Sequence, residues 1–484
     1  MKKLIKFWAL VLVLSTAEGR VIHIPEDWPD IQTGIEMASD GDTVLVAPGT
    51  YLITHPSKRI NFEGKAILLT SEKGADSTVI DGWEEYGPIV TFECGEDTNS
   101  VIEGFTITNG RSDRGGSGIL CINNSSPKIC NNIITDNILD YEAAEGLGAG
   151  ICCDTASPVI VGNLISANYC QVAIDFYGIG GGIFLRNSSA SILDNTISSN
   201  WATLGGGIAC LSSSSVRIEG NQIEGNEARG GKWANEGAGI YCDSESAMYI
   251  ANNTITGNCV YYAYYIYDGG GIYCSGDSII ITENTITNNS ASKGGGIYTS
   301  SFSVEVSENN IYGNTHYGLY SSDTNGVVDA DSNWWGDKTG PYHPTLNPGG
   351  LGDTVSNWVD FEPWLSKPSG VNDNPLPTVL PEGFELSQNW PNPFNANTVI
   401  RYSLIVERGQ SKGHSGRPSA VSLRIYNILG QEIKTLIDEK QAPGYYSVLW
   451  DGTNQKGHEL PSGVYFYRLK AGRFSETRKI LLIR

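Results

Sequence analysis

The sequence is poor in charged residues, and especially in basic ones. Asp, Glu, Lys and Arg make up 18% of its 484 residues, against about 25% in an average globular domain. There are 32 Lys and Arg against 53 Asp and Glu, which gives a formal net charge of −21. A protein that binds a phosphate backbone needs the opposite sign. The composition therefore argues against nucleic acid as a partner.

Long apolar runs are missing after the first residues. Residues 1–19 have the pattern of a secretory signal peptide, in which three lysines precede a short apolar core and small residues follow it. No later stretch approaches the ~18 apolar residues of a membrane-spanning helix. We therefore expect an exported protein, secreted or held at a cell surface, with no transmembrane segment.

Helical periodicity is also absent, and a glycine repeat takes its place. The 58 glycines are about 12% of the chain, against a usual ~7%. A short glycine-rich motif that ends in an aliphatic residue recurs at 115–119, 148–151, 180–183, 205–208, 237–240, 269–272, 294–297 and, in degenerate form, 316–319. Successive motifs are 32, 32, 25, 32, 32, 25 and 22 residues apart. Such a period indicates a repeat architecture.

A second motif, Asn-x-Ile-x-x-Asn, keeps step with the glycine motif. Its paired asparagines are Asn132 and Asn137, Asn163 and Asn168, Asn195 and Asn200, Asn221 and Asn226, Asn253 and Asn258, Asn284 and Asn289, and Asn309 and Asn314. The separation from each motif aliphatic to the next Asn is always 12 or 13 residues, whereas the separation from the second Asn to the next motif aliphatic varies from 5 to 15. All the length variation therefore falls in one turn of the repeat.

Isoleucines stand at fixed places around each Asn motif, for example Ile160 and Ile165. They alternate with polar residues in a period of two, the pattern of short strands with one buried face. Strands at a period of ~22–32 residues, none of which can bury its face alone, predict a solenoid of stacked parallel coils. We expect glycine and asparagine to supply left-handed backbone at the corners.

With these motifs, residues 20–365 resemble a right-handed parallel β-helix of the pectin-lyase-like type. Residues 28–51 are similar to the amphipathic N-terminal capping helix and first strand of these proteins, and residues 333–364 to a segment that closes many bacterial β-helices. The resemblance implies an all-β solenoid, but it does not imply a particular chemistry.

Ten cysteines lie between Cys94 and Cys274, which in an exported protein first suggests disulfides. Five of them follow a motif isoleucine by two residues: Cys121, Cys153, Cys210, Cys242 and Cys274. That spacing points them into the core, where a thiol packs as a small hydrophobe. We expect buried thiols stacked from coil to coil; because neighbouring coils are ~4.8 Å apart, a few inter-coil disulfides are an alternative. The single cysteines lack the ligand spacing of a metal site.

The chain changes character after residue 365. Residues 366–383 are Pro-rich and lack periodicity, which is typical of a linker. Residues 384–484 carry alternating segments at Val399–Leu404, Val421–Ile428, Tyr445–Trp450 and Val464–Leu469, separated by turn signals. They predict a small antiparallel Ig-like β-sandwich.

This C-terminal module is similar to the type A C-terminal sorting domain of type IX secretion cargo. The similarity is carried by FELSQNWPNPFNANTVIRYSL (384–404), LRIYNILGQEIKTL (423–436), PGYYSVLWDG (443–452), PSGVYFYRLKAG (461–472) and RKILLIR (478–484). It implies a Gram-negative host, transport across the outer membrane by the type IX machinery, and anchoring at the surface or release. A related sandwich occurs in flagellar hook-capping proteins, a context that the signal-peptide pattern argues against.

The long turns that carry the length variation are rich in aromatic residues, and insertions on one side of a solenoid favour a binding surface there. If the coils stack in register, two long turns flank the short turn at Trp201, roughly 10 Å apart. We hypothesise a cleft that binds extracellular polysaccharide by stacking sugar rings on Tyr169, Tyr177, Trp201, Trp233, Tyr265 and Tyr267. Alternatively, these side chains pack on one another and only order the turns.

Catalysis has weaker support in the sequence. Asp175, Glu236 and Asp268 border the proposed cleft, and a carboxylate pair held ~5–9.5 Å apart hydrolyses glycosides. The three do not fall at equivalent positions of the repeat, however, and the local catalytic signatures of polygalacturonases and pectate lyases are absent. Glycan binding or adhesion is therefore the first hypothesis. A polysaccharide lyase, glycoside hydrolase or epimerase is the second, and a passive envelope protein the third.

No cofactor is expected. Asp329 to Asn333 alternate oxygen-bearing residues in the manner of a calcium loop, but Trp334 and Gly340 stand where an EF-hand has Gly and Glu. Structural calcium between acidic turns is an alternative that the sequence leaves open.

Overall fold

The computed structural model contains two compact units, Met1–Gly370 and Val371–Arg484. It describes residues 19–82, 86–112, 115–139, 146–170, 177–212, 214–230, 234–261, 266–276, 278–369, 384–386, 389, 392, 394, 398–404, 419–441, 444–472 and 474–483. Residues 1–18 of the signal-peptide pattern and 370–383 of the predicted linker lie outside the described residues.

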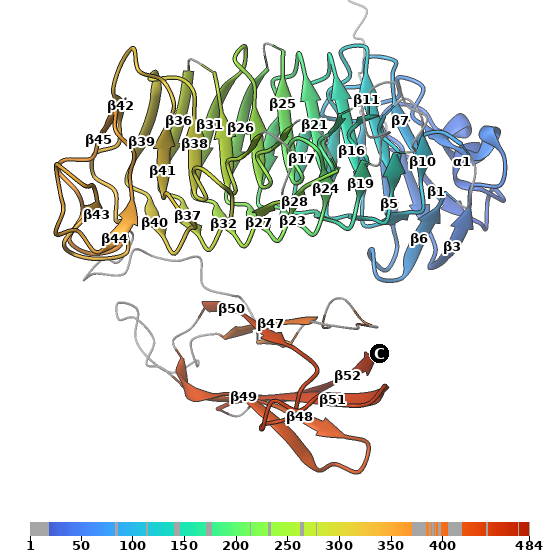
Figure 1. Cartoon of the computed structure of the whole chain (residues 1–484). Coiled ribbons are helices and arrows are strands. Elements are labelled where there is room, and N and C mark those ends of the chain that lie inside the picture. Colours follow the sequence, from blue (N-terminus) through green and yellow to red (C-terminus); the bar gives the residue numbers. More distant parts are fainter. Residues whose placement is uncertain are drawn as a thin grey trace, which may run out of the picture. The chain divides into compact units, whose positions relative to one another are not determined.

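The first unit is a solenoid of parallel strands, which Figure 1 shows stacked from α1 at one end to β43 at the other. A coil passes through up to four sheets, which we number 1 to 4 in chain order.

Sheet 1 consists of β1 (Val21–Ile24), β2 (Thr43–Val46), β5 (Leu68–Ser71), β8 (Val101–Glu103), β12 (Lys128–Cys130), β17 (Val159–Val161), β22 (Ser191–Leu193), β26 (Ser215–Glu219), β31 (Ala247–Ala251), β36 (Ser278–Thr282), β39 (Val304–Ser307), β42 (Val328–Asp329) and β45 (Val359–Asp360). Sheet 2 consists of β3 (Gly49–Leu52), β6 (Thr78–Asp81), β9 (Thr106–Thr108), β13 (Ile133–Thr135), β18 (Leu164–Ser166), β23 (Thr196–Ser198), β27 (Gln222–Glu224), β32 (Thr254–Thr256), β37 (Thr285–Thr287) and β40 (Asn310–Tyr312).

Sheet 3 is shorter and consists of β10 (Arg111–Ser112), β14 (Ile138–Leu139), β19 (Tyr169–Cys170), β24 (Trp201–Ala202), β28 (Glu227–Ala228) and β33 (Cys259–Val260). Sheet 4 consists of β4 (Ile60–Asn61), β7 (Val90–Phe92), β11 (Ile119–Ile122), β16 (Ile151–Asp154), β21 (Ile183–Arg186), β25 (Ile208–Leu211), β30 (Ile240–Cys242), β35 (Ile272–Cys274), β38 (Ile297–Thr299) and β41 (Leu319–Ser321).

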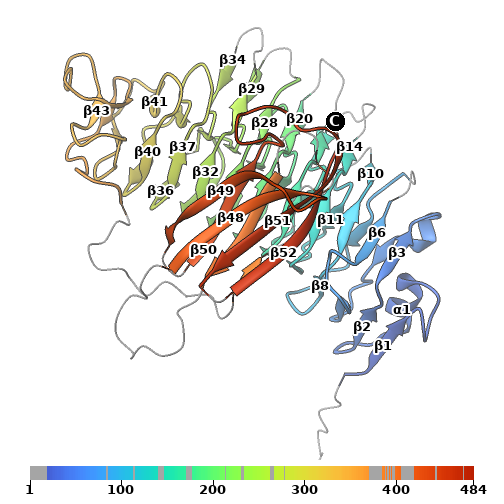
Figure 2. The same cartoon turned by 90° about the horizontal axis from the view of Figure 1, so that it is seen from below.

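The turn of variable length lies between sheets 3 and 4. Two short parallel pairs form there, β15 (Gly146–Leu147) with β20 (Gly178–Ile179) and β29 (Ala234–Glu236) with β34 (Ile266–Asp268). Figure 2 shows β20, β29 and β34 along one edge of the solenoid. The length variation therefore falls at one corner, as the spacing of the motifs predicted.

Two ladders of asparagines stabilise the corners. In the first ladder the backbone N–H and Nδ2 of Asn163 both donate to Oδ1 of Asn195, at 2.9 and 3.0 Å, and Nδ2 also donates to the carbonyl of Ile129 at 2.9 Å. The left-handed backbone belongs to the residue before the ladder asparagine, for example Asp194 with φ 52°. Glycine and asparagine are common at this position, for example Gly162 with φ 68° and Asn131 with φ 55°, so the prediction that they supply left-handed backbone at the corners is confirmed. The ladder asparagines themselves have another role, which is to satisfy buried backbone groups.

The inward side chains form one continuous core. The isoleucines of the Asn motif, such as Ile160 and Ile165, are fully buried. Cys121, Cys153, Cys210, Cys242 and Cys274 are fully buried as well, and none of the ten cysteines, all of which lie among the described residues, forms a disulfide. The prediction of buried thiols is confirmed. Burial raises the pKa of Cys153, Cys210, Cys242 and Cys274, so these thiols are neutral at pH 7.

The N-terminal end is closed by α1 (Ile31–Met37), which buries Ile31 and Ile35 against the core. Asp30 caps this helix by accepting a hydrogen bond from the N–H of Thr33 at 2.9 Å. A strand of sheet 1, β1, precedes the helix, so the first strand does not follow it as the resemblance implied. A 3₁₀ turn spans Pro56–Lys58.

The C-terminal end is closed by the segment that resembles a β-helix closure, which includes β43 (Pro341–Tyr342) and β44 (Gly352–Thr354). Trp335 is fully buried on the core. Asp353 accepts hydrogen bonds from the N–H groups of Gly313 and Asn314 at 2.8 and 2.9 Å and so ends the second ladder. Asn333 ends the first, and its Oδ1 accepts from the N–H of Asn309, so this oxygen is already used within the fold.

The second unit is built from two antiparallel sheets around a core of its own. One sheet comprises β46 (Glu385–Leu386), β47 (Thr398–Leu404) and β50 (Gly444–Trp450), and the other β49 (Glu432–Gln441), β48 (Ser419–Asn427), β51 (Gly463–Ala471) and β52 (Phe474–Leu482). The four predicted strands are present, and β46, β49 and β52 are strands beyond them. Trp450 and Tyr467 are fully buried in this core.

Candidate functional site

One outward position on the strands of sheet 4 forms a continuous in-register column. From the N-terminal end these residues are Asn61, Thr91, Leu120, Cys152, Phe184, Ala209, Tyr241, Tyr273, Tyr298 and Tyr320. From Leu120 onward each is the residue immediately after the motif aliphatic. The column changes along the solenoid from polar, through apolar, to tyrosine.

A second column runs beside the first, made by the residue immediately before the motif glycine. It consists of Leu147, Ile179, Leu204, Glu236, Asp268 and Lys293, each paired with the next. We call it the pre-glycine column. Glu236 and Asp268 are therefore at equivalent positions of the repeat, contrary to what the sequence analysis concluded.

The motif glycine brings the two columns together. Gly237 adopts φ 60°, and a Cβ built on it would lie 2.8 Å from the Cβ of Tyr241. The chain thus folds back on itself at a place where only glycine fits without strain. The residue before the glycine consequently packs beside the residue after the isoleucine, as the cluster that contains Leu147, Cys152 and Phe184 shows.

Glu236 and Asp268 are nearly buried, with exposed fractions of 8% and 6%. Burial, and next the charge of Asp268, raises the pKa of Glu236 to about 7. Burial also raises the pKa of Asp268, although its Oδ1 accepts a hydrogen bond from Ser292 at 2.9 Å. Lys293 follows in the column, and its Nζ lies 5.4 Å from the ring centroid of Tyr320. Glu236, with a pKa close to neutral pH, is thus the register neighbour of Asp268, and Asp268 is in turn the register neighbour of Lys293.

The four tyrosines stack on one another, and we call them the tyrosine row: Tyr241, Tyr273, Tyr298 and Tyr320. Successive ring centroids are 5.1, 5.0 and 5.6 Å apart, with interplanar angles of 12°, 7° and 15°. Their faces cover each other, so the row offers ring edges and hydroxyl groups to a ligand. Burial raises the pKa of Tyr241 and Tyr273, which keeps these hydroxyls neutral and able to donate.

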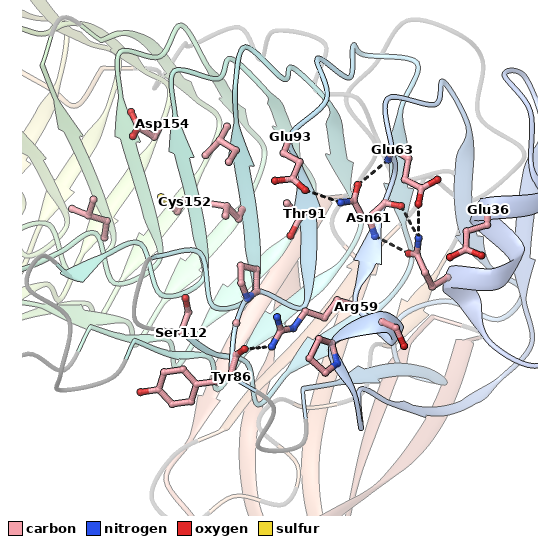
Figure 3. A pocket seen from close by; sticks show the side chains of 18 of the residues that line it. Glu36, Arg59, Asn61, Glu63, Tyr86, Thr91, Glu93, Ser112, Cys152 and Asp154 are labelled. Atoms are coloured by element: carbon pink, nitrogen blue, oxygen red, sulfur yellow. Dashed lines mark hydrogen bonds between the residues drawn. The ribbon is translucent and has the colours of Figure 1, made fainter.

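A groove of about 870 Å³ lies over the N-terminal part of the same face (Figure 3). Its charged side chains are largely paired with protein groups. Arg59 donates to the carbonyl of Tyr86, and the side-chain amide of Asn61 donates to Glu93 at 2.8 Å. Arg186 forms a two-point ion pair with Asp154, at 3.1 and 2.7 Å. The groove therefore differs in chemistry from the tyrosine row.

The aromatic residues predicted for the cleft do not lie together: some are on sheet 3, and others are in or near the variable turn. Tyr169 and Trp201 are register partners on sheet 3, with ring centroids 5.8 Å apart at 47°. The guanidinium of Arg229 lies 4.7 Å from the centroid of Trp201, and Arg229 also pairs with Glu227 at 2.8 Å. Trp201 is accordingly a half-buried member of a packed group.

The other predicted site residues lie in or near the variable turn. Tyr177 is 37% exposed just before β20, and Tyr267 on β34 packs against a small apolar cluster with Ala228 and Val260. Asp175, Trp233 and Tyr265 lie outside the described residues. The structure therefore brings Glu236 and Asp268 together, and Tyr169 and Trp201 together on another sheet.

The tyrosine row was not found from the sequence. Its signal is present, because alignment of the coils on the motif aliphatic puts Tyr at the next position in four successive coils, and an acidic or basic residue before the glycine in three. The hypothesis instead relied on the length and aromatic content of the variable turns, which do not include these fixed positions.

Comparison with known families agrees with this architecture. The family described as a right-handed beta helix region matches residues 174–334. The first unit has the fold of a right-handed parallel β-helix. The family described as a protein of unknown function, DUF1565, matches residues 71–180, and the FlgD Ig-like domain matches residues 411–473. Comparisons with curated proteins and with solved structures gave no match.

Among the described residues, no helix is long and apolar enough to cross a membrane, and no group of three or more His, Cys, Asp or Glu side chains is placed to hold a metal ion.

Proposed function

We propose that the β-helix binds extracellular polysaccharide along the outward face of sheet 4, at the tyrosine row and the charged end of the pre-glycine column. The observation that carries this proposal is the in-register row of four tyrosines, whose spacing of 5.0 to 5.6 Å repeats once per coil. A linear array of hydroxyl donors suits a linear polymer that presents hydroxyl groups at regular intervals. A strongly acidic β-helix favours a neutral polymer over a polyanion.

The location follows from the two ends of the chain. The signal-peptide pattern at residues 1–19 and the similarity of residues 384–484 to a type IX sorting domain support export to the outside of a Gram-negative cell. Polysaccharide binding there would let the protein act as an adhesin, anchored at the surface or released.

The test removes hydroxyl groups while keeping the rings. The double variant Tyr241→Phe/Tyr273→Phe should bind immobilised neutral polysaccharides about tenfold more weakly, because two donors are lost. Tyr249→Phe is the matched control, since Tyr249 is exposed on sheet 1. Unchanged retention of the double variant would contradict the proposal, and a loss caused by Trp201→Ala instead would move the site to sheet 3.

A second candidate function is acid–base catalysis on the bound glycan, favoured by the buried, in-register pair of Glu236 and Asp268. In hydrolysis, protonated Glu236 would give its proton to the bridging oxygen as the glycosidic bond breaks. Asp268 would take a proton from the water whose oxygen forms the new bond to the sugar. Assays for reducing ends and for unsaturated products with the Glu236→Gln variant test this function apart from binding.

A further inference from the structure

A pocket of about 370 Å³ lies at the C-terminal end of the tyrosine row. Tyr320, the last member of the row, contributes to its wall, together with Tyr317, Tyr342 and Trp358. The polar lining comes from hydroxyl and amide groups such as Ser322 and Asn357. None of its described lining residues is charged, in contrast to the groove at the other end of the face.

The row ends at this pocket because β41 is the last strand of sheet 4. The ring of Tyr320 stacks on Tyr298 at 5.6 Å and meets Tyr317 edge to face at 4.9 Å. Beyond Tyr320 the closing segment of the solenoid supplies the wall instead of a further coil. A polymer lying along the row would therefore meet a pocket at this end.

Trp358 is held in an unusual way for an exposed aromatic residue. Its φ is 68°, the left-handed region that bulky residues rarely adopt, and 46% of it is exposed. Its carbonyl accepts a hydrogen bond from the N–H of Val328 at 2.9 Å, which fixes the backbone next to β45. Glycine would adopt this backbone conformation without strain, so folding does not require a tryptophan at this position. Residues held in such conformations are concentrated at ligand-binding sites.

We infer that this pocket binds the terminal sugar of a neutral glycan chain whose following units lie along the tyrosine row. The inference rests on the proposed function of the row and specifies the part of the polymer that is recognised. Trp358 and Tyr342, which is 41% exposed, offer ring surface against which the apolar face of a pyranose packs. The hydroxyl and amide groups of the lining bind its hydroxyls, and because none of the described lining residues is charged, the pocket favours a neutral sugar over a uronic acid.

The decisive variant is Trp358→Gly in the full chain, because glycine relieves the left-handed strain and so leaves folding intact. Binding is measured by titration with neutral gluco- and manno-oligosaccharides of graded length, with the reducing end free or reduced to the alditol. We expect the variant to bind short oligosaccharides about tenfold more weakly and to keep its retention on long polymers. Leu351→Ala is the matched control, since Leu351 is 76% exposed on the same closing segment and does not line the pocket.

The outcomes separate the two proposals. If Tyr241→Phe/Tyr273→Phe weakens binding of polymer and Trp358→Gly leaves short oligosaccharides bound as tightly as before, the chain-end pocket is overturned and the row stands. An equal loss on short and on long ligands would also overturn chain-end recognition. Light scattering provides a further check: if Trp358→Gly only dissociates a self-associated form and leaves glycan affinity unchanged, the pocket is a contact between copies instead.

Discussion

At the scale of single residues, burial gives the Glu236 carboxyl group a different ionisation behaviour from that of an exposed glutamate. An exposed glutamate is ionised at neutral pH, whereas this carboxyl group is 8% exposed, beside Asp268, with its pKa raised to about 7. The folded state therefore holds a proton that the unfolded chain releases near its ordinary value of 4.5.

This difference makes the stability of the β-helix depend on pH. Between about pH 4.5 and 7 the folded state binds more protons than the unfolded chain, so the free energy of unfolding falls as pH rises and levels off above 7. The fall attributable to Glu236 is at most about 3 kcal/mol. Glu236→Gln should remove it and should be more stable than the parent at pH 8.

Denaturant unfolding at pH 5 and pH 8 measures this effect. Glu245→Gln is the control, because Glu245 is exposed in the turn after β30 and should keep the parental pH dependence. A Glu236→Gln variant with the same difference between pH 5 and pH 8 as the parent would contradict the assignment.

At the scale of elements, the glycine before each strand of sheet 4 determines where the pre-glycine column lies. Gly269 has φ 70°, and an added Cβ would lie 2.6 Å from the Cβ of Tyr273. Gly225, at the corner between sheets 2 and 3 of the preceding coil, has φ 61°, but a Cβ built on it would meet nothing within 4 Å. Alanine at Gly225 would therefore add backbone strain alone, whereas alanine at Gly269 would add both backbone strain and steric overlap.

Gly269→Ala should lower the free energy of unfolding by about 3 kcal/mol or more, because strain and overlap add. Gly225→Ala should cost only about 1 kcal/mol, from strain alone. Denaturant unfolding measures both variants. Equal losses would show that the close approach of Gly269 to Tyr273 contributes nothing.

The sequence predicts the elements well because their determinants are local. Ile160 and Ile165 flank Asn163 at fixed spacing, and that spacing alone indicates two short strands and a corner. The contacts of the candidate site are not local: Glu236 and Asp268 are 32 residues apart, and their pairing depends on the register between coils. The packing of Trp201 under Arg229 likewise depends on side-chain directions that turn length does not reveal.

At the scale of the whole molecule, the two units have separate cores. The β-helix core extends from Ile22 to Phe361, and the core of the second unit from Leu386 to Leu482. Because stability comes mainly from burial within each core, each should unfold as a unit of its own.

A chain that ends at Gly370 should therefore keep the unfolding midpoint of the β-helix and its affinity for neutral polysaccharide. Calorimetry of the full chain should show a transition that is missing from the shortened one. Loss of glycan retention in the shortened chain, with an unchanged β-helix transition, would assign the binding to the second unit.

The motif glycine has one further consequence, which concerns how such a protein can change its ligand. The residue before the glycine and the residue after the isoleucine both lie on the sheet 4 face, while the core isoleucines and ladder asparagines of the coil face elsewhere. Two substitutions in one coil can therefore change the surface chemistry over about 5 Å, the distance between neighbouring coils. The residues that determine the fold stay unchanged. The succession from Leu204 and Ala209 to Glu236 and Tyr241 in the next coil is one such exchange, recorded within a single chain.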